Sequence, residues 1–427
     1  MGLVDFVDLK LESFTLSELK QLAADYQTHA SNAIGKSGDS TLSMFPSHLA
    51  KRDLTPTDAT VLAMDIGGTN VRLGLYRLMS GKVKLVEGTE IEHNQFRGTE
   101  LAMDEYSKYV GEYVKKFLER YGQVRPEALG FTFSYPAKIV KNNSHIDASR
   151  EGHSDDWGKG FIVRGSSVNI SERLRNGFVA SGIAFEKWVT LNDVVALLLA
   201  DQEASASVVV GTGYNIGITD THGNIYNTES AYFRVKQIMK SLSKPARLYL
   251  EDLRLKLERL NLSEEESVDL KKFSEIQIAG GYLYKLLLYA MAIVGEGDMN
   301  MFRAFRKIEG ELISMILKGD YDTIEERGGI QLSQMQREYL TKIAEQLIDR
   351  ATDLVAAELA GAVKFGGSEH ELIVAADGSV INFVPGFQEM LVQKMSRILN
   401  GTTIRIKAVK DSGLRGAAVA GFVQLQS

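Results

Sequence analysis

The stretch Leu62-Ala-Met-Asp-Ile-Gly-Gly-Thr-Asn-Val-Arg72 decides how this chain folds. An apolar run leads into a turn with two glycines, and apolar residues then alternate with other residues, which predicts a strand, a tight turn and a second strand. Backbone N–H groups without a neighbouring Cβ, together with the Thr69 hydroxyl, suit phosphate oxygens, and Asp65 could hold Mg²⁺ through water. A plain hairpin explains the same residues, so this turn alone leaves both interpretations open.

Glycine-rich turns return twice further along the chain, the first of them again between two strands. An apolar run at 207–210 leads into Gly211-Thr212-Gly213, and a strand continues from Tyr214. Two similar turns predict two similar α/β domains that face each other across a cleft, with two loops around one polyphosphate. A third turn, Gly413 to Gly416, opens a final helix, whose N-terminus favours a nucleotide phosphate.

Asn192 and Asp193 follow the apolar strand 188–191 and precede a helix rich in Ala and Leu. An aspartate at a strand end beside a cleft can accept a hydroxyl proton during phosphoryl transfer. Asn and Asp are also the residues that most often cap a helix. The residue pattern leaves both roles open, and one residue can serve both.

Composition excludes several classes of function. The net charge of −6 provides no basic excess for nucleic acid or an anionic membrane, so we expect neither partner. The absence of cysteine removes disulfides, thiolate nucleophiles and Cys-ligated zinc. P-loop, dinucleotide-binding, HExxH and protein-kinase motifs are missing. The chain has no 18-residue apolar run and its start lacks a signal-peptide pattern, so we expect a cytoplasmic protein.

The remaining pattern predicts further elements. Helical spacing indicates helices at 101–121 and 337–364, a charged helical segment at 231–272, and a helical lead-in over 1–50. We expect strands at 128–133, 372–376 and 404–409, a polar loop or hairpin at 138–160, and a hairpin turn at Asp377-Gly378.

These residues together resemble the hexokinases and glucokinases. The resemblance runs in order from about 44 to 421, and so many motifs in the same order are highly specific. The matching segments are Met44-Phe-Pro46, Leu62 to Arg72, Leu129-Gly-Phe-Thr-Phe-Ser-Tyr-Pro136, Trp157-Gly-Lys-Gly-Phe161, Leu191-Asn-Asp-Val-Val195, Val210-Gly-Thr-Gly-Tyr-Asn215, Asn227-Thr-Glu229, Ala376-Asp-Gly-Ser379 and Gly413-Leu-Arg-Gly-Ala-Ala418.

The resemblance implies an α/β protein with the actin-like (ribonuclease H-like) two-lobe ATPase fold and a sugar in the interdomain cleft. The implied small lobe is 56–191, and the large lobe combines 1–55 with 192–427. The implied activity is ATP-dependent phosphorylation of a hexose, glucose first, at its 6-hydroxyl, the first step of glycolysis, with ATP and Mg²⁺ as cofactors.

The resemblance also implies roles for individual residues. Asp193 is the catalytic base, and Asp65 holds the metal through water. The implied substrate-binding residues are Ser134, Tyr135, Gly158, Lys159, Asn192, Asp193, Asn215, Glu229 and Glu275. The implied ATP-binding residues are Asp65, Gly67, Gly68, Thr69, Asn70, Arg72, Gly211, Thr212, Gly213, Gly413, Leu414, Arg415 and Gly416.

The chain departs from the family's pattern at three sites. Gly158 stands where the family usually has Thr, Ser230 replaces the usual Trp, and Leu414 interrupts a Gly-Ser-Gly run. These departures bear on sugar preference and nucleotide affinity. An alternative function is a catalytically weak sugar sensor, which would be marked by loss of Asp193, Lys159 or a phosphate loop; none is lost. Among related sugar kinases, the bacterial repressor/kinase type requires cysteines that are absent here, and cytoskeletal or chaperone ATPases lack the sugar segments.

Overall fold

The computed structural model describes the chain except residues 1–8, 68–69, 93–99, 123, 136, 143–144, 150–155, 159–160, 166–168, 260–270 and 368–370. The chain divides into two compact units. Unit 1 comprises Met1–Met44, Val208–Ile216 and Thr228–Ala408, and unit 2 comprises Phe45–Ser207, Gly217–Asn227 and Val409–Ser427. The lobes expected from the resemblance, 56–191 against the rest, stay a prediction.

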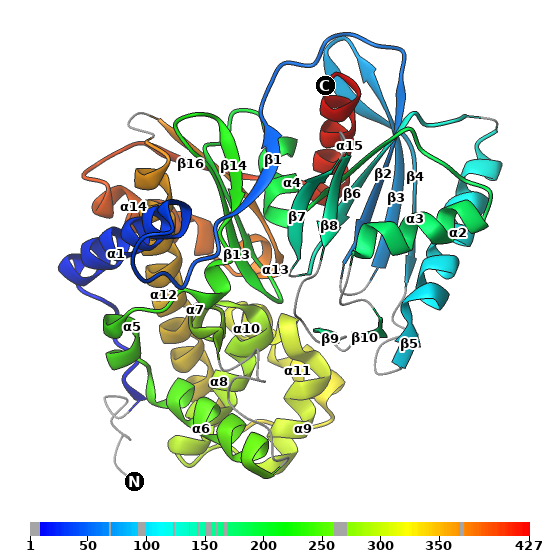
Figure 1. Ribbon diagram of the computed structural model, residues 1–427. Helices are drawn as coiled ribbons and strands as arrows, with labels where there is room; N and C mark the ends of the chain where they lie inside the picture. The colour runs from blue at the N-terminus through cyan, green and yellow to red at the C-terminus, as the bar shows by residue number, and fades with distance from the viewer. Residues whose placement is uncertain are drawn as a thin grey trace. The chain divides into compact units, whose positions relative to one another are not determined.

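Unit 2 is built on a mixed seven-stranded sheet with the order β4-β3-β2-β6-β11-β8-β7 (Figure 1). The central strands β2, β6 and β11 run parallel, whereas β3 and β4 form an antiparallel ribbon at one edge. The strand bounds are Thr60–Ile66 (β2), Asn70–Met79 (β3), Lys82–Glu92 (β4), Ala128–Phe133 (β6), Lys138–Asn142 (β7), His145–Ser149 (β8) and Lys187–Leu191 (β11).

β6 is buried along its whole length, as expected for a strand with helices on its sheet's faces. The C-terminal helix α15 packs on β2, β6 and α4 (Figure 1). Gly130 of β6 faces the Ala417 carbonyl so closely that any Cβ would collide with it, and this allows α15 to lie directly on the sheet. The helix bounds in unit 2 are Met103–Arg120 (α2), Ile170–Ala180 (α3), Asp193–Ala200 (α4) and Ser412–Leu425 (α15).

A small three-stranded sheet with the order β5-β10-β9 also belongs to unit 2. Its strands are Glu100–Ala102 (β5), Asp156–Gly158 (β9) and Phe161–Arg164 (β10).

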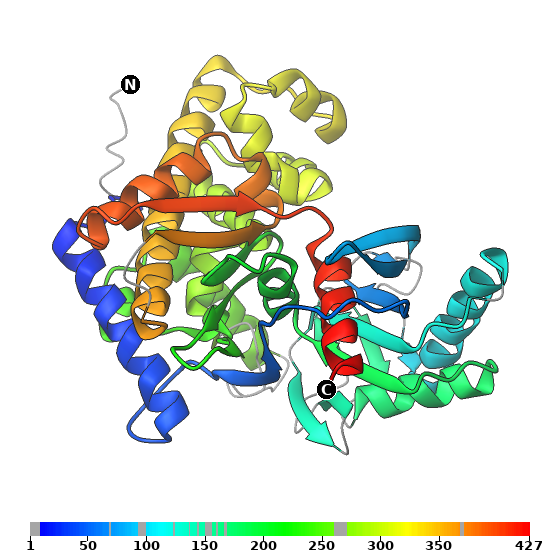
Figure 2. The same ribbon diagram turned by 90° about the horizontal axis from the view of Figure 1, so that it is seen from above.

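The long helix α12, Gln334–Phe365, is the central element of unit 1. A capping box of Ser333 and Gln336 fixes its start. The helix α1, Leu16–Gly35, lies against it, as both ribbon views show (Figures 1 and 2). Gly361 of α12 permits this contact, because a Cβ there would lie 2.7 Å from the Tyr26 Cβ.

The second large sheet has the order β1-β14-β13-β12-β15-β16. β15 and β16 pair in parallel and lie side by side in Figure 2. The bounds are Phe45–Ala50 (β1), Ala206–Val210 (β12), Tyr214–Thr219 (β13), Asn224–Asn227 (β14), Leu372–Asp377 (β15) and Ile404–Ala408 (β16).

The remaining helices of unit 1 lie around α12. Their bounds are Ser230–Tyr232 (η3), Lys236–Lys240 (α5), Lys244–Arg259 (α6), Phe273–Ile278 (α7), Gly280–Ile293 (α8), Met299–Ile308 (α9), Glu309–Glu311 (η6), Leu312–Leu317 (α10), Tyr321–Gly328 (α11), Ser379–Phe383 (α13) and Phe387–Ile398 (α14).

The elements expected from the sequence are largely confirmed, including the helices at 103–120 and 334–365 and the hairpin β7–β8. Two expectations were wrong. In the part of the lead-in that the structure describes, the α-helix runs from Leu16 to Gly35, and Pro46 belongs to a strand. Asp377-Gly378 does not turn a hairpin: the strand is followed by a short helix, because Gly378 takes φ 112°, a conformation open to glycine, to start it. No helix in the described ranges is both long and apolar enough to cross a membrane.

Candidate active site

Three parallel strands of unit 2 bring their carboxyl ends to one edge of the sheet. Asp65 of β2 and Leu191 of β11 are both register partners of Thr132 on β6. The residues after these strand ends are Gly67, Ser134, and Asn192 with Asp193. In open α/β sheets, ligands bind at the carboxyl ends of the strands. Residues expected from the sequence to bind phosphate, bind sugar and act as base therefore leave the same sheet edge.

Asp65 lies where β2 meets the start of α15. Its side chain is only 14% exposed, and its Oδ2 lies 3.9 Å from Nη1 of Arg72 on the paired strand. A Cβ on Gly413 would come within 2.6 Å of Oδ2, so the absence of a side chain there makes room for the carboxylate. Thr132 Oγ1 fixes the helix start by donating to the Gly413 carbonyl at 2.8 Å. A carboxylate, a guanidinium and a helix N-terminus thus meet at one point.

The segment Ser134-Tyr135 is tied to the first glycine turn. The Ser134 N–H donates to the Ile66 carbonyl at 3.3 Å, and the Tyr135 hydroxyl donates to the Gly67 carbonyl at 3.0 Å. Tyr135 is buried. Its hydroxyl therefore supports the turn.

Asn192 and Asp193 both accept a hydrogen bond at the start of α4. Asn192 is the N-cap of α4, and its Oδ1 accepts from the Val194 N–H at 3.1 Å. Asp193 is the first residue of the helix, and its Oδ1 also accepts from Val194 N–H, at 2.8 Å. Its side chain is half-buried at the positive end of the helix. Asn192 is the residue in the N-cap position, and Asp193 shares the same N–H from the first position of the helix.

The second glycine turn, in unit 1, is fastened to the start of α8 by its carbonyl groups. Gly280 N–H donates to the Gly211 carbonyl at 2.8 Å, and Gly281 N–H donates to the Thr212 carbonyl at 3.2 Å. The N–H groups of Thr212 and Gly213 have no hydrogen-bond partner in the part of the chain that the structure describes. The turn is thus held by its acceptors and keeps donors for an anion, as a phosphate loop requires.

Close packing supports this turn from behind. A Cβ on Gly281 would lie 2.6 Å from the Thr212 carbonyl oxygen, and one on Gly378 would lie 2.5 Å from the Val210 carbonyl. Gly378 belongs to the segment that the resemblance assigns to the adenosine end. The structure therefore places that segment against the second glycine turn within unit 1.

Asn215 and Glu229 come together just after this turn. Asn215 Oδ1 accepts from the Ile216 N–H at 2.8 Å and from the Ser230 N–H at 3.2 Å. The amide oxygen is thus occupied, which makes Nδ2 the donor end of the side chain. Glu229 is buried and holds a left-handed conformation with φ 54°. Such strain in a non-glycine residue is frequent at functional sites.

Glu275 of α7 is fixed through both carboxylate oxygens. Lys272 Nζ donates to Oε1 at 3.0 Å, and the Tyr214 N–H donates to Oε2 at 3.2 Å. Its carboxylate is buried next to Gly213, since a Cβ on that glycine would lie 3.3 Å from Oε2. Within unit 1, Asn215, Glu229, Glu275 and the glycine turn therefore form one cluster.

Two sequence models of protein families, both described as hexokinase, match residues 8–202 and 205–423.

The chain belongs to the hexokinase family.

Relatives in the hexokinase family match most of its length. A hexokinase of Schwanniomyces occidentalis is 26% identical over 394 residues, covering 84% of this chain and 80% of the relative. A hexokinase of Schistosoma mansoni is 24% identical over 411 residues, covering 89% and 87%. The solved structure of the Schistosoma mansoni hexokinase complexed with glucose covers 98% of both chains with a TM-score of 0.77 and 19% identity. The fold is thus the actin-like ATPase fold of hexokinases, and the family phosphorylates hexoses with ATP.

Some expected hexokinase site residues lie outside these clusters. Gly68, Thr69 and Lys159 fall outside the described residues, and Gly158 is described only as backbone of β9. Leu414 is buried and Arg415 is exposed on α15. Gly416 packs against the Ala196 carbonyl of α4, where any Cβ would collide. In the structure Gly416 serves the contact between two helices.

The sequence did not reveal the residues that hold the expected hexokinase contacts in place. Lys272 carries a signal, since it lies three residues before Glu275 at helical spacing. Glu358 carries another: it is the only charged residue between Asp353 and Lys364 in an otherwise apolar run of α12. Such a residue in a buried helix needs partners, and these partners are described below.

Proposed function

We propose that this protein transfers the γ-phosphoryl group of Mg-ATP to the 6-hydroxyl of a hexose, with glucose as the first candidate, in the first step of glycolysis. The observation that carries this proposal is the position of Asp193: it follows a central strand of the unit 2 sheet, half-buried, with the helix cap supplied by Asn192.

Asp193 acts as the general base in this proposal. As the hexose O6 attacks the γ-phosphorus, its proton passes to the Asp193 carboxylate and a new O–P bond forms. The bond from the γ-phosphorus to the bridging oxygen breaks. The electron pair of that bond stays on the bridging oxygen, which leaves as part of ADP. Mg²⁺ enters with ATP as part of the substrate, and Asp65 would hold it through water.

The remaining clusters provide binding. Asn215 and Asn192 offer side-chain amides, and Glu229 and Glu275 offer carboxylates, to the sugar hydroxyls, with Ser134 and Lys159 completing the set. Carboxylates fixed in this way reject a sugar that lacks or inverts the matching hydroxyl, because the buried acceptor would then lose its partner. The N–H groups of Thr212 and Gly213 suit the ATP phosphates.

The proposal is tested with Asp193→Asn in a coupled assay for ADP release over a panel of hexoses. We expect hexose-dependent turnover by the native protein and a loss of about 10²–10⁴-fold in kcat for the variant. Hexose binding, measured by calorimetry, should survive because the amide keeps the shape of the carboxylate.

The matched control is Asp104→Asn, which removes a carboxylate from the first turn of another helix of unit 2, where the side chain is 77% exposed. It should leave turnover unchanged. Hexose binding without turnover by the native protein would exclude the kinase proposal and favour the sugar sensor.

A further inference from the structure

A carboxyl group lies deep inside unit 1, beneath the cluster of Asn215 and Glu275. Glu358 of α12 is 1% exposed. Its Oε2 accepts from the Tyr214 hydroxyl at 3.0 Å, and its Oε1 lies 2.6 Å from Ser274 Oγ. Neither partner belongs to α12, so this side chain joins three elements: α12, β13 and α7.

The hydrogen-bond geometry around Ser274 favours a proton on Glu358. Ser274 Oγ has one proton but two acceptors in reach, Glu358 Oε1 at 2.6 Å and the Phe233 carbonyl at 3.1 Å. When the carboxyl is neutral, it donates to Ser274 Oγ, and the serine donates to Phe233. The two Glu358 oxygens, Ser274 Oγ and the Phe233 carbonyl then each have a hydrogen-bond partner. An ionised carboxylate would instead take the Ser274 proton away from the Phe233 carbonyl.

Burial supports the same protonation state. Burial raises the pKa of Glu358 from 4.5 to about 8, against the opposing hydrogen bonds from Ser274 and Tyr214. The two phenols that face it, Tyr26 of α1 and Tyr214 of β13, stay protonated because burial raises the pKa of each.

Two charged groups on neighbouring elements, Glu275 and Lys394, are engaged with other partners. On α7, Glu275 is paired with Lys272. On α14, Lys394 is bonded to Asp349 and Asp353, which lie more than one turn from Glu358 along α12.

The two partners of Glu358 are the direct neighbours of proposed sugar contacts. Tyr214 precedes Asn215, and its own N–H holds Glu275; Ser274 precedes Glu275. We propose that Glu358 is a positioning residue, which as a neutral acid ties the strand that carries Asn215 to the helix that carries Glu275. This inference rests on the proposed function, because it takes Asn215 and Glu275 as sugar contacts.

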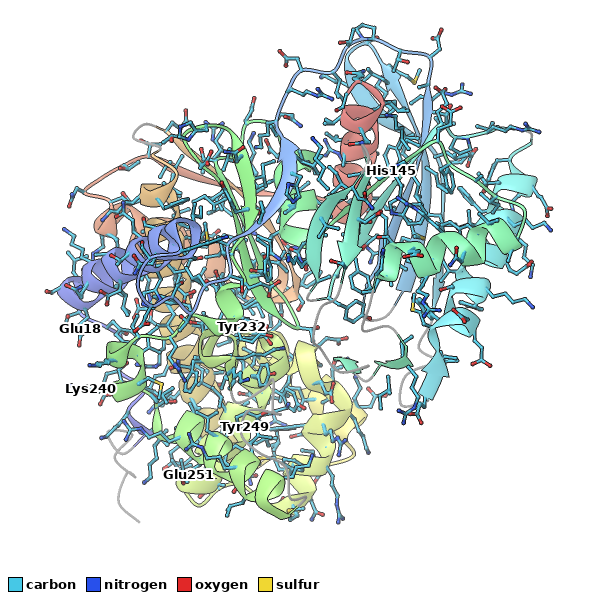
Figure 3. All side chains as sticks on the ribbon, in the orientation of Figure 1. Glu18, His145, Tyr232, Lys240, Tyr249 and Glu251 are labelled. Carbon is cyan, nitrogen blue, oxygen red and sulfur yellow. The ribbon has the colours of Figure 1, made fainter. Side chains whose placement is uncertain are left out.

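A second polar branch reaches Asn215 from α1. The Tyr26 and Ser230 hydroxyls lie 2.6 Å apart, and Ser230 Oγ lies 2.7 Å from Thr228 Oγ1. The Ser230 N–H in turn donates to Asn215. Figure 3 labels Tyr232, the last residue of η3, beside α7, which contacts η3. Ser230, where the family usually has Trp, thus joins Tyr26 to Asn215 through hydrogen bonds.

The proton on Glu358 gives this support a pH dependence with a defined sign. When folding raises the pKa of a group, the group's full contribution to the stability of the folded state is present below its ordinary pKa. That contribution is lost as the pH rises through the pKa that the group has in the folded protein. Above about pH 8 the carboxylate takes the only Ser274 proton, and the Phe233 contact is lost. We expect the hexose KM of the native protein to increase by about threefold or more between pH 7 and 9, with a smaller change in kcat.

The test compares Glu358→Gln, Glu358→Ala and Tyr214→Phe in steady-state assays from pH 6.5 to 9. Glu358→Gln keeps one donor and one acceptor without a titrating proton, so its hexose KM should stay near the native value at pH 7 and become independent of pH. Glu358→Ala should raise the hexose KM about tenfold, with little change in the ATP KM. Tyr214→Phe keeps the ring, and it should raise the hexose KM even if the alanine variant does not fold.

The matched control is Thr352→Val, a buried change on the same helix, at a hydroxyl that donates to the Ile348 carbonyl within α12. It should lower stability without changing the hexose KM or its pH profile. A native pH profile in Glu358→Gln, with turnover intact, would overturn the positioning role alone. Failure of the native protein both to bind and to phosphorylate any hexose would overturn the proposed function, and this inference with it.

Discussion

At the scale of single residues, Gly413 shows how a missing side chain makes room for a charged one. The Asp65 carboxylate occupies the space that a Cβ on Gly413 would fill, 2.6 Å from its Oδ2. The sequence presented this glycine as the start of a helix and, through the resemblance, as an ATP-binding residue, but not as a neighbour of Asp65. Its contact is with a strand residue almost 350 positions earlier, and helix propensity says nothing about that contact.

We predict that Gly413→Ala displaces the Asp65 carboxylate. The added methyl group must move the carboxylate or the helix start, which should cost about 1–3 kcal/mol in the free energy of unfolding. In the coupled assay, the KM for Mg-ATP should increase about tenfold, whereas the hexose KM should change little.

The control is Gly310→Ala, where the methyl group meets no atom within 4 Å. Chemical denaturation should show no loss for this variant. An unchanged KM for Mg-ATP in Gly413→Ala would mean that Asp65 does not serve the nucleotide.

At the scale of elements, the start of α8 fixes the second glycine turn. Two consecutive N–H groups of the helix, from Gly280 and Gly281, hold two carbonyls of the turn. Helix starts carry N–H groups without intrahelical partners, and here the turn satisfies them. The glycine turn and the start of α8 are about 70 residues apart in sequence. Neither segment, considered alone, shows which groups its carbonyls or N–H groups bond to.

We predict that Gly281→Ala weakens nucleotide binding through this contact. Its Cβ would lie 2.6 Å from the Thr212 carbonyl oxygen and would push the turn away from the helix. The KM for Mg-ATP should rise severalfold, at a stability cost of about 1–3 kcal/mol.

A second substitution on α8 separates stability from function. Ala292 is exposed near the end of the helix, and Ala292→Gly should cost about 1 kcal/mol through helix propensity alone. Thermal melts compare the stability of Gly281→Ala and Ala292→Gly, and ATP titrations compare their KM for Mg-ATP. If Ala292→Gly raised the KM for Mg-ATP equally, the effect would come from lost stability and not from the turn.

At the scale of the whole molecule, the proposed sugar contacts are divided between the two units. Asn192 and Ser134 belong to unit 2, whereas Asn215, Glu229 and Glu275 belong to unit 1. Ligand binding stabilises the elements that contact the ligand against local opening.

We predict that a hexose slows amide hydrogen exchange in segments of both units. The segments to follow are 188–200 in unit 2 and 272–283 in unit 1, measured with and without saturating glucose. Helix α2 of unit 2, at 103–120, is the internal control and should exchange at the same rate in both samples. Protection confined to one unit would contradict the assignment of sugar contacts to both.

The sequence by itself determined the family, the fold class and the order of the main elements. Strand and helix signals are local, and they correctly predicted the two strands on either side of the first glycine turn and the helix of 334–365. The candidate residues Asp193, Asn215 and Glu275 also carried a local signal, because each belongs to a short motif. Local propensity was wrong at Asp377-Gly378, because tertiary packing against the Val210 carbonyl, not turn preference, decides that backbone.

Only the tertiary structure decided what supports these residues. The hydrogen bond between Glu358 and Ser274, the Lys272 contact with Glu275 and the space that Gly413 leaves for Asp65 all depend on distances across folded elements. A single sequence records residue types but not their neighbours in space. A buried acid therefore appears in the sequence as one polar residue in an apolar helix, and its function appears only when its partners are known.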